Sequence, residues 1–229
     1  MTEKAALIIF AKSPMPNYAK TRLIDPLSAA QAAEFYANCI KDISLIMKDE
    51  TVFDFWFGIA PEKFDTKIWP IDLKNYRHFF QKGANLGERM VNAFNLLFDK
   101  SYKKVAIIGS DFPHISPKLI NEAFAKLDHC DCVLGPSKDG GYYLIALKKK
   151  CNPLFKNINW STNKVYSQTF NQAKKNGIKI YTLDTHYDVD TIVELKRLYH
   201  DLKIMDQSKP EFPFNVWNFI KNDLNTLFI

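Results

Sequence analysis

The chain has 229 residues, of which 47% are hydrophobic, 14% aromatic and 24% charged, and its formal net charge is +6. This composition is typical of a folded globular protein, and it excludes a disordered chain, a collagen-like repeat and a disulfide-stapled scaffold. The modest excess of positive charge suits anionic ligands. It is too small and too scattered along the sequence for a protein dedicated to nucleic-acid binding.

The sequence has no stretch near the roughly 18 consecutive apolar residues that a membrane-spanning helix needs. The apolar run Ala5–Phe10 is also shorter than the core of a signal peptide, so it is better explained as a first strand. None of the four cysteines belongs to a CxxC pair or has the spacing of zinc ligands, which favours free thiols. These features predict a cytoplasmic protein without a membrane span.

In chain order, the first predicted element is a strand at 6–11, a continuous apolar run of the kind that is covered on both faces of a sheet. A helix follows from Ser28, which forms a capping box with Gln31 and precedes an apolar stripe that reaches Ile46. The next predicted elements are strands at 52–59 and 78–80, a helix at 87–98 and a buried strand at 105–108.

The second half of the chain continues this alternation. Ser116 and Pro117 mark the start of a helix, with a cap residue followed by proline in the first turn. The remaining predicted elements are strands at 132–134, 142–147 and 178–183, and helices at 162–175, from Thr191 (capping box with Glu194) and at 212–229. Strands that alternate with helices predict a three-layer α/β/α sandwich around a mostly parallel sheet.

The sequence also predicts the domain organisation. We expect residues 1–229 to form one domain, because the chain contains no linker, repeat or low-complexity segment. The aromatic tail 212–229 is predicted to be a helical extension that docks on the body of its own chain. A homodimer held together by this tail is the alternative.

In open α/β sheets, ligands bind at the carboxyl ends of the strands, so the loops there are the candidate site. The loop after strand 6–11 carries the cations Lys12, Lys20 and Arg22, with the hydroxyl donor Thr21 among them. Arginine can bind phosphate oxygens through two hydrogen bonds, and lysine acts as a point charge. The loop is therefore a candidate nucleotide-phosphate site, although it matches neither GxxxxGK[ST] nor GxGxxG. A solvated basic loop is the alternative.

A second candidate loop, Gly109-Ser110-Asp111, follows the strand at 105–108 directly. Gly109 and Ser110 are candidate nucleotide contacts. The Asp111 carboxylate is well placed to hold Mg²⁺ or Mn²⁺ against a diphosphate, because these hard cations prefer oxygen ligands. A simple turn ahead of Pro113, closed by the Asp111 side chain, is the alternative.

Two further aspartates, Asp188 and Asp190, point the same way if the backbone between them is extended, and they are predicted to complete a metal site with Asp111. Capping of the next helix by Asp190 or Thr191 is the alternative.

A last candidate segment is Asp139-Gly140-Gly141. Its two glycines allow the backbone to approach a ligand closely, and Asp139 is a candidate general base that would take a proton from a bound acceptor molecule. A hairpin turn is the alternative. Histidine offers no HExxH motif, and serine has no GxSxG elbow.

The candidate segments occur in an order that is more specific than any one of them. They are FAKSPMPNYAKTRL (10–23), GANLGERM (83–90), IGSDFPHIS (108–116), LGPSKDGGYYLI (134–145), NWST (159–162) and DVDT (188–191). In this order they resemble a bacterial family of glycosyltransferase-like proteins with the nucleotide-diphospho-sugar transferase (GT-A) fold. The family is also known as the radical-SAM/selenodomain-associated transferases, and it is DUF2064-like.

This resemblance implies a metal-dependent enzyme that uses Mg²⁺ or Mn²⁺, takes a nucleotide-diphospho-sugar donor and transfers the sugar to a small-molecule acceptor. The family is similar in turn to nucleotidyltransferases such as phospholactate guanylyltransferase. Transfer of a nucleotide from a nucleoside triphosphate to a phosphorylated small molecule is therefore the alternative. A nucleotide-binding module without catalytic activity is a third hypothesis.

The resemblance also implies roles for the residues that match the family's motifs. Lys20 and Arg22 of KTRL would lie over the nucleotide phosphates, Asp111 would bring the metal ion, and an aspartate of DVDT would supply a second carboxylate. The pair Gly140-Gly141 would line the acceptor or sugar side. One departure is Asn17, which stands where family members usually have glycine. Asparagine tolerates a positive φ, so we expect the turn to persist.

Overall fold

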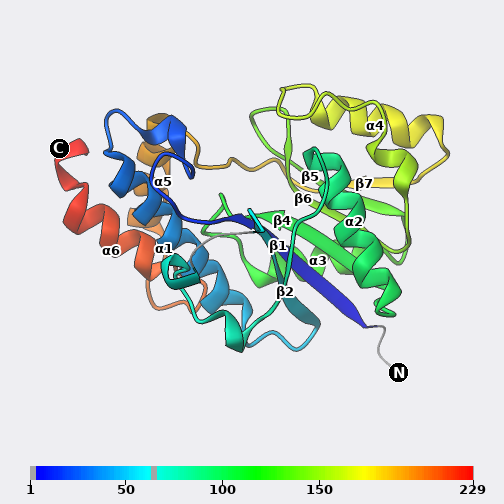
Figure 1. Cartoon of the computed structure of the whole chain (residues 1–229), viewed down its shortest axis with the longest axis horizontal. Helices are drawn as coiled ribbons and strands as arrows, with labels where there is room; N and C mark the ends of the chain where they lie inside the picture. Colours follow the sequence, from blue (N-terminus) through cyan, green and yellow to red (C-terminus); the bar gives the residue numbers. More distant parts are fainter. Residues whose placement is uncertain (1–3, 63–65, 229) are drawn as a thin grey trace.

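In the computed structural model, which describes residues 4–62 and 66–228, seven strands form one sheet in the order β3-β2-β1-β4-β6-β5-β7 (Figure 1). The strands are β1 (Ala5–Lys12), β2 (Phe53–Ala60), β3 (Arg77–Phe80), β4 (Lys104–Gly109), β5 (Cys132–Pro136), β6 (Tyr142–Leu147) and β7 (Ile180–Thr182). All lie where the sequence predicts them, and β7 is shorter than predicted. Only β6 among these strands runs antiparallel to its neighbours, which confirms a mostly parallel sheet.

The helices are α1 (Ala29–Met47), α2 (Leu86–Asp99), α3 (Pro117–Lys126), α4 (Val165–Lys175), α5 (Ile192–Ile204) and α6 (Phe214–Asp223). Both predicted capping boxes form, at Ser28 with Gln31 and at Thr191 with Glu194. No helix in the described part of the chain is long and apolar enough to cross a membrane.

Two helices differ from the prediction in their bounds. The helix predicted at 162–175 begins at Val165, because Ser161 has a left-handed φ of 62° and the Thr162 hydroxyl donates to the carbonyl of Asn159. The helix predicted at 212–229 begins at Phe214 and ends at Asp223. Leu224 is buried with a φ of −122°, which is not helical, and only a short 3₁₀ turn follows.

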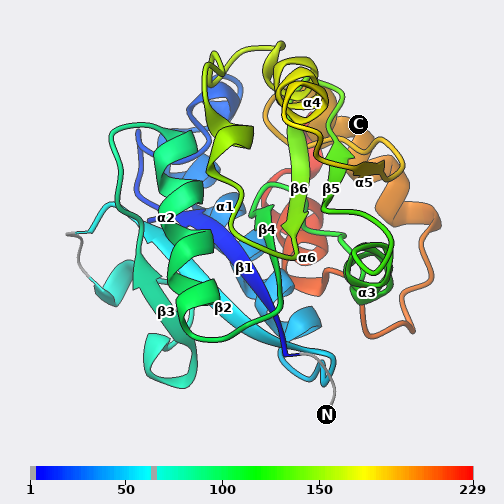
Figure 2. The same ribbon diagram turned by 90° about the vertical axis from the view of Figure 1, so that its right-hand side faces the viewer.

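The helices cover both faces of the sheet and complete the predicted three layers (Figures 1 and 2). On one face, α1 and α3 pack on side chains such as Leu7, Ile9 and Phe57. On the other face, α2 and α4 pack on side chains such as Ile8 and Ile107. Residues with alternate numbers in one strand thus enter opposite cores, as a strand's period of two requires. The fold therefore agrees with the α/β/α prediction.

A third core lies outside α1, where α5 and α6 pack on the side of that helix that faces away from the sheet (Figure 1). The stripe predicted on this helix is thus divided, with Phe35 and Cys39 facing α5 and α6 while Tyr36 and Ile43 face the sheet. Burial on two sides explains why α1 carries apolar residues over so wide an arc.

One buried carboxylate anchors α6 to this third core. Asp42 of α1 accepts hydrogen bonds from the Asn215 backbone N–H at 3.0 Å, the Asn215 side-chain amide at 2.7 Å and the Val216 N–H at 2.8 Å. Burial raises the pKa of the Asp42 carboxyl above its usual value, although the three donors favour the ionised form. A side chain 173 positions away thus caps the first turn of α6.

Candidate functional site

A cavity of about 630 Å³ opens at the carboxyl ends of β1 and β4. The register explains its position, because Phe10 of β1 pairs with Gly109 of β4 and the residues that follow both strands reach one edge of the sheet. Since β6 is antiparallel, its first residue lies at the same edge. The predicted site residues that line the cavity are Lys12, Lys20, Thr21, Arg22, Gly109, Ser110, Asp111, Asp139, Gly141, Asp188 and Asp190.

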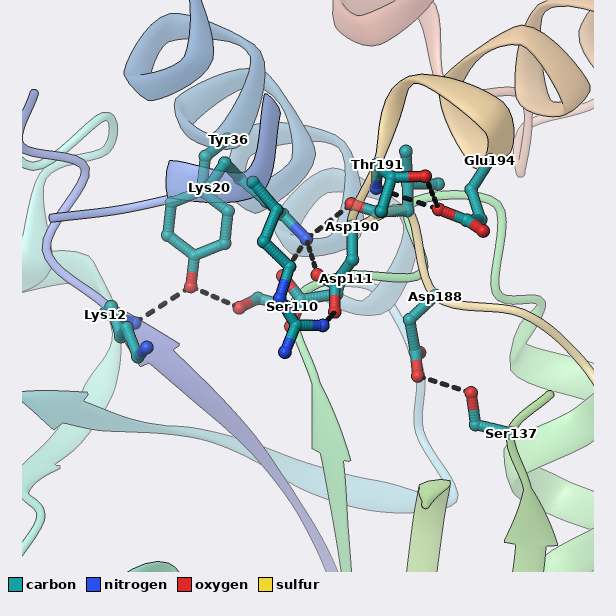
Figure 3. A network of polar contacts seen from close by, with 12 residues as sticks. Lys12, Lys20, Tyr36, Ser110, Asp111, Ser137, Asp188, Asp190, Thr191 and Glu194 are labelled. Carbon is teal, nitrogen blue, oxygen red and sulfur yellow. Dashed lines mark hydrogen bonds and ion pairs between the residues drawn. The ribbon is translucent and has the colours of Figure 1, made fainter. Parts of the chain in front are cut away.

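The ammonium group of Lys20 lies between two of the aspartates (Figure 3). Its Nζ is 2.5 Å from Asp111 Oδ1, 3.0 Å from Asp190 Oδ1 and 2.6 Å from the Val189 carbonyl, and the side chain is 3% exposed. Burial lowers the pKa of Lys20, but the two carboxylates outweigh burial and raise the pKa above its usual value. All three N–H donors are therefore used within the protein, and none is left for the predicted phosphate contact.

The loop that carries Lys20 turns at two residues with left-handed backbone. Asn17 has a φ of 60°, which confirms that asparagine keeps the turn usually made by glycine. Lys20 itself has a φ of 51°, a conformation that costs about 1–3 kcal/mol for a residue other than glycine. The ion pairs of Lys20 offset this strain, so the conformation of the loop depends on them.

A chain of hydrogen bonds joins this loop to the neighbouring strands. The Lys12 backbone N–H donates to Tyr36 Oη at 2.9 Å, and Ser110 Oγ donates to the Phe10 carbonyl at 3.1 Å. The hydrogen of Ser110 is thus committed, so the Tyr36 hydroxyl donates to Ser110 Oγ, which lies 2.5 Å away (Figure 3). Ser110 lines the cavity, but its hydroxyl holds the scaffold in place.

Two cations of the loop remain available to an anion in the cavity. Lys12 is exposed, and its Nζ lies 5.9 Å from the centre of the Tyr18 ring. Arg22 has a 69% exposed side chain, and its Nη1 is 3.7 Å from Asp190 Oδ2. A contact of that length leaves most of the guanidinium free for phosphate oxygens.

Asp188 lies in a different environment from Asp190. Its Oδ2 accepts a hydrogen bond from Ser137 Oγ at 2.6 Å (Figure 3). Burial raises the pKa of Asp188 to about 7, and the negative charges of Asp111 and Asp139 add to that rise, although Ser137 opposes it. The backbone beside it is joined to the loop after β4, because the Val189 N–H donates to the Asp111 carbonyl at 2.9 Å. Asp188 is therefore a carboxylate in a region of unbalanced negative charge.

A divalent metal ion such as Mg²⁺ or Mn²⁺ needs several oxygen ligands around one point. Within residues 4–62 and 66–228, no group of three or more His, Cys, Asp or Glu side chains is arranged to bind a metal ion. The predicted set of three aspartates does not form one ligand cluster, because Lys20 pairs with both Asp111 and Asp190. Asp111 and Asp188 line the cavity, and although Asp111 Oδ1 is paired with Lys20, a cation beside Asp188 would relieve the negative charge around that residue. Two carboxylates fit Mg²⁺ or Mn²⁺ when substrate phosphates supply other ligands.

The Asp139-Gly140-Gly141 segment forms a turn. Asp139 Oδ1 accepts a hydrogen bond from the Gly141 N–H at 2.9 Å. Gly140 has a φ of 88°, and a Cβ there would lie 2.2 Å from the Asn163 carbonyl oxygen. Glycine is required at this position by the neighbouring backbone, and Gly140 is absent from the cavity wall, unlike Gly141.

Several cavity residues were not predicted from the sequence. Trp160 lines the cavity together with Asn163, and its ring covers Gly87, where a Cβ would lie 2.5 Å from ring atoms. The NWST motif at 159–162 was one of the segments that carry the family resemblance, but nothing in its sequence indicated that it lines the cavity. Tyr36 had the spacing of a core residue, and its hydroxyl role depends on contacts with distant segments.

Known proteins resemble this chain in sequence and structure. A family model described as an uncharacterized protein conserved in bacteria (DUF2064) matches residues 48–162. A 2-phospho-L-lactate guanylyltransferase of Methanocaldococcus jannaschii is 26% identical over 204 residues, which cover 84% of this chain and 81% of that protein.

The structural comparisons confirm the predicted fold. The crystal structure of a protein described as a nucleotide-diphospho-sugar transferase, from Desulfovibrio desulfuricans G20, matches with a TM-score of 0.89 and 28% identity. The match covers 100% of this chain and 99% of that one. The 4-diphosphocytidyl-2C-methyl-D-erythritol synthase of Anaerococcus prevotii matches with a TM-score of 0.57 and 13% identity over 89% of this chain and 100% of that one, a likeness of fold alone.

Proposed function

This chain belongs to the DUF2064 family of bacterial proteins and is a transferase, and on that premise we propose that it transfers a nucleotide from a nucleoside triphosphate to a small phosphorylated molecule. The family resemblance favours sugar transfer and keeps nucleotidyl transfer as the alternative, because the motifs themselves do not separate the two reactions. The comparisons support the alternative better, because relatives that match 84% of the chain are named guanylyltransferases. GTP is therefore the first donor to test.

The observation that carries this proposal is the meeting of two available cations and a half-exposed carboxylate in one cavity. Lys12, Arg22 and Asp111 all line this cavity. A volume of about 630 Å³ is within the usual range of small-ligand sites. Positive charge beside a carboxylate able to hold a divalent cation is the arrangement that a triphosphate donor needs.

In the proposed reaction, an oxygen of the acceptor phosphate attacks the α-phosphorus of the triphosphate. A P–O bond forms there, the bond from the α-phosphorus to the oxygen that bridges to the β-phosphate breaks, and its electron pair leaves with pyrophosphate. A phosphate monoester is mostly ionised at pH 7, so the attacking oxygen carries no proton and needs no general base. A general-base role for Asp139 would belong to sugar transfer onto a hydroxyl.

The residues of the chain have separate roles in this reaction. Arg22 and Lys12 bind the phosphates and stabilise the charge that develops on the departing pyrophosphate. Asp111 and Asp188 would hold Mg²⁺ or Mn²⁺, which would supply Lewis-acid stabilisation of the phosphates when bound. Lys20 fixes the orientation of the Asp111 carboxylate.

The test is pyrophosphate release from GTP, CTP, UTP or ATP with Mg²⁺ or Mn²⁺, using 2-phospho-L-lactate as the probe acceptor and phosphorus NMR to identify the product. We expect turnover with one triphosphate and a loss of about 10²–10³ in rate for Asp111→Asn. The matched control, Asp223→Asn, changes an exposed carboxylate at the end of α6 and should keep full activity. Hydrolysis or transfer of a nucleotide sugar, without pyrophosphate release from any triphosphate, would overturn the proposal.

A further inference from the structure

A second cavity adjoins the first, and we propose that it binds the acceptor and selects one with a carboxylate besides its phosphate; this rests on the proposed function. Its volume is about 290 Å³, and it shares Arg22, Asp139, Asp188 and Asp190 with the wall of the first cavity. A small molecule can therefore extend from one cavity into the other past the Arg22 side chain.

The residues shared by the two cavities determine how the acceptor is oriented between them. Its phosphate must reach the α-phosphorus of the donor, so it lies at the junction, where Arg22 is 69% exposed. The rest of the acceptor then extends toward Lys138 and Arg197, two cations that line only the second cavity.

Arg197 is held in position by the protein. Its guanidinium carbon lies 4.0 Å from the centre of the Tyr187 ring, and its Nε is 3.7 Å from Asp201 Oδ2. The Tyr187 hydroxyl donates to the same Asp201 oxygen at 2.6 Å, which fixes the ring below the guanidinium. Stacking keeps the planar group oriented while its two terminal nitrogens can form the paired hydrogen bonds that a carboxylate accepts.

The carboxylates of the second cavity have donors of their own. Glu194 accepts from the backbone N–H and the hydroxyl of Thr191, at 2.8 and 2.6 Å. Asp190 pairs with Lys20, and Asp139 accepts from the Gly141 N–H. Within the described residues Lys138, in contrast, forms no ion pair. Asp188, the remaining carboxylate, accepts from Ser137 Oγ at 2.6 Å and is assigned to the metal ion in the proposed function, so Lys138 and Arg197 are the charged groups left to a ligand at this end of the cavity.

Two more features of the wall suit a small organic anion. The cavity lies at the first turn of α5, whose positive dipole end favours negative charge. Val193 is 69% exposed on the same wall and offers an apolar surface to the carbon atoms between the two anionic groups. A short aliphatic acid that carries a phosphate matches both.

The test is equilibrium binding measured by isothermal titration calorimetry, in the presence of a non-hydrolysable GTP analogue and Mg²⁺. Two probes are compared: 2-phospho-L-lactate, and propane-1,2-diol 2-phosphate, in which a hydroxymethyl group replaces the carboxylate. We expect Arg197→Met and Lys138→Met each to weaken binding of the first probe about 10–100-fold, with little effect on the second. The matched control is Lys196→Met, which removes an exposed cation next to Arg197 that lines neither cavity.

The outcomes separate this inference from the proposed function. Equal binding of the two probes by the unaltered protein, or equal affinities of Arg197→Met and Lys196→Met for 2-phospho-L-lactate, would overturn the acceptor site. A carboxylate-dependent affinity without pyrophosphate release from any triphosphate would keep the anion site and refute nucleotidyl transfer. Loss of the probe preference in the two cavity variants, with unchanged affinity for the GTP analogue, supports the proposal.

Discussion

Replacing Lys20 with methionine tests whether one buried ammonium group holds the site together. Its Nζ lies 2.5 Å from Asp111 and 3.0 Å from Asp190. Removing one partner of a buried ion pair costs about 3–5 kcal/mol, because the remaining charge loses its compensation. Both carboxylates are 38% exposed, so water compensates part of the loss. We therefore expect Lys20→Met to lower the free energy of unfolding by about 2–3 kcal/mol.

Urea unfolding followed by tryptophan fluorescence measures this loss, and thermal unfolding should show a melting temperature lower by about 4–12 °C. Lys12→Met is the matched control, because it removes an exposed lysine from the same loop and should change stability by less than about 0.5 kcal/mol. Added Mn²⁺ should stabilise Lys20→Met more than the unaltered protein, since Asp111 and Asp190 then lack a cation. Equal unfolding free energies for the two lysine variants would refute the reasoning.

Three other perturbations test separate parts of the structure. Burial lowers the pKa of His114 from 6.5 to about 4, so between these values the unfolded chain binds more protons than the folded one. The free energy of unfolding should therefore fall by up to about 3 kcal/mol as the pH drops from 6.5 to 4, and it should fall less steeply in His114→Leu. The same pH dependence of the free energy of urea unfolding in both proteins would exclude His114 as its cause. Asp42→Ala removes the acceptor of three N–H groups, two of Asn215 and one of Val216, and should cost about 2–4 kcal/mol in urea unfolding, whereas a loss below about 0.5 kcal/mol would show that α6 docks without it. Gly87→Ala places a methyl group 2.5 Å from the Trp160 ring, so it should lower the free energy of unfolding by about 1–3 kcal/mol and weaken binding of the GTP analogue. The higher helix propensity of alanine acts in the opposite direction, and a stabilised variant would contradict the close packing.

Much of the fold follows from local sequence signals. The short continuous apolar runs predict strands because such runs suit burial on both faces of a sheet. The caps at Ser28 and Thr191 are predictable because their partners, Gln31 and Glu194, lie only three residues away. Local signals fail at the end of the chain. The tail 212–229 carries apolar residues throughout, but only the packing of Leu224 shows where the helix stops.

The candidate site was predictable in position and less so in its internal contacts. Ligands of open α/β sheets bind at the carboxyl ends of the strands, and this rule alone predicted that Lys12, Arg22 and Asp111 lie at one edge of the sheet. It could not show that Lys20 pairs with Asp190, because those residues are 170 positions apart. Gly140 shows the same limit of sequence-based prediction. Its glycine makes room for the backbone of Asn163, but the sequence looks the same when a glycine makes room for a ligand.

The pairing of Lys20 with Asp111 and Asp190 also has a consequence for how this family can vary. The three side chains come from three separate segments, and Arg22 lies 3.7 Å from Asp190, so two cations face two carboxylates in one small volume. Loss of Lys20 alone leaves both carboxylates without their buried cation, and loss of both carboxylates leaves a buried ammonium group without a partner. Related sequences should therefore retain the lysine together with at least one of the carboxylates, or lose all three in the same lineage.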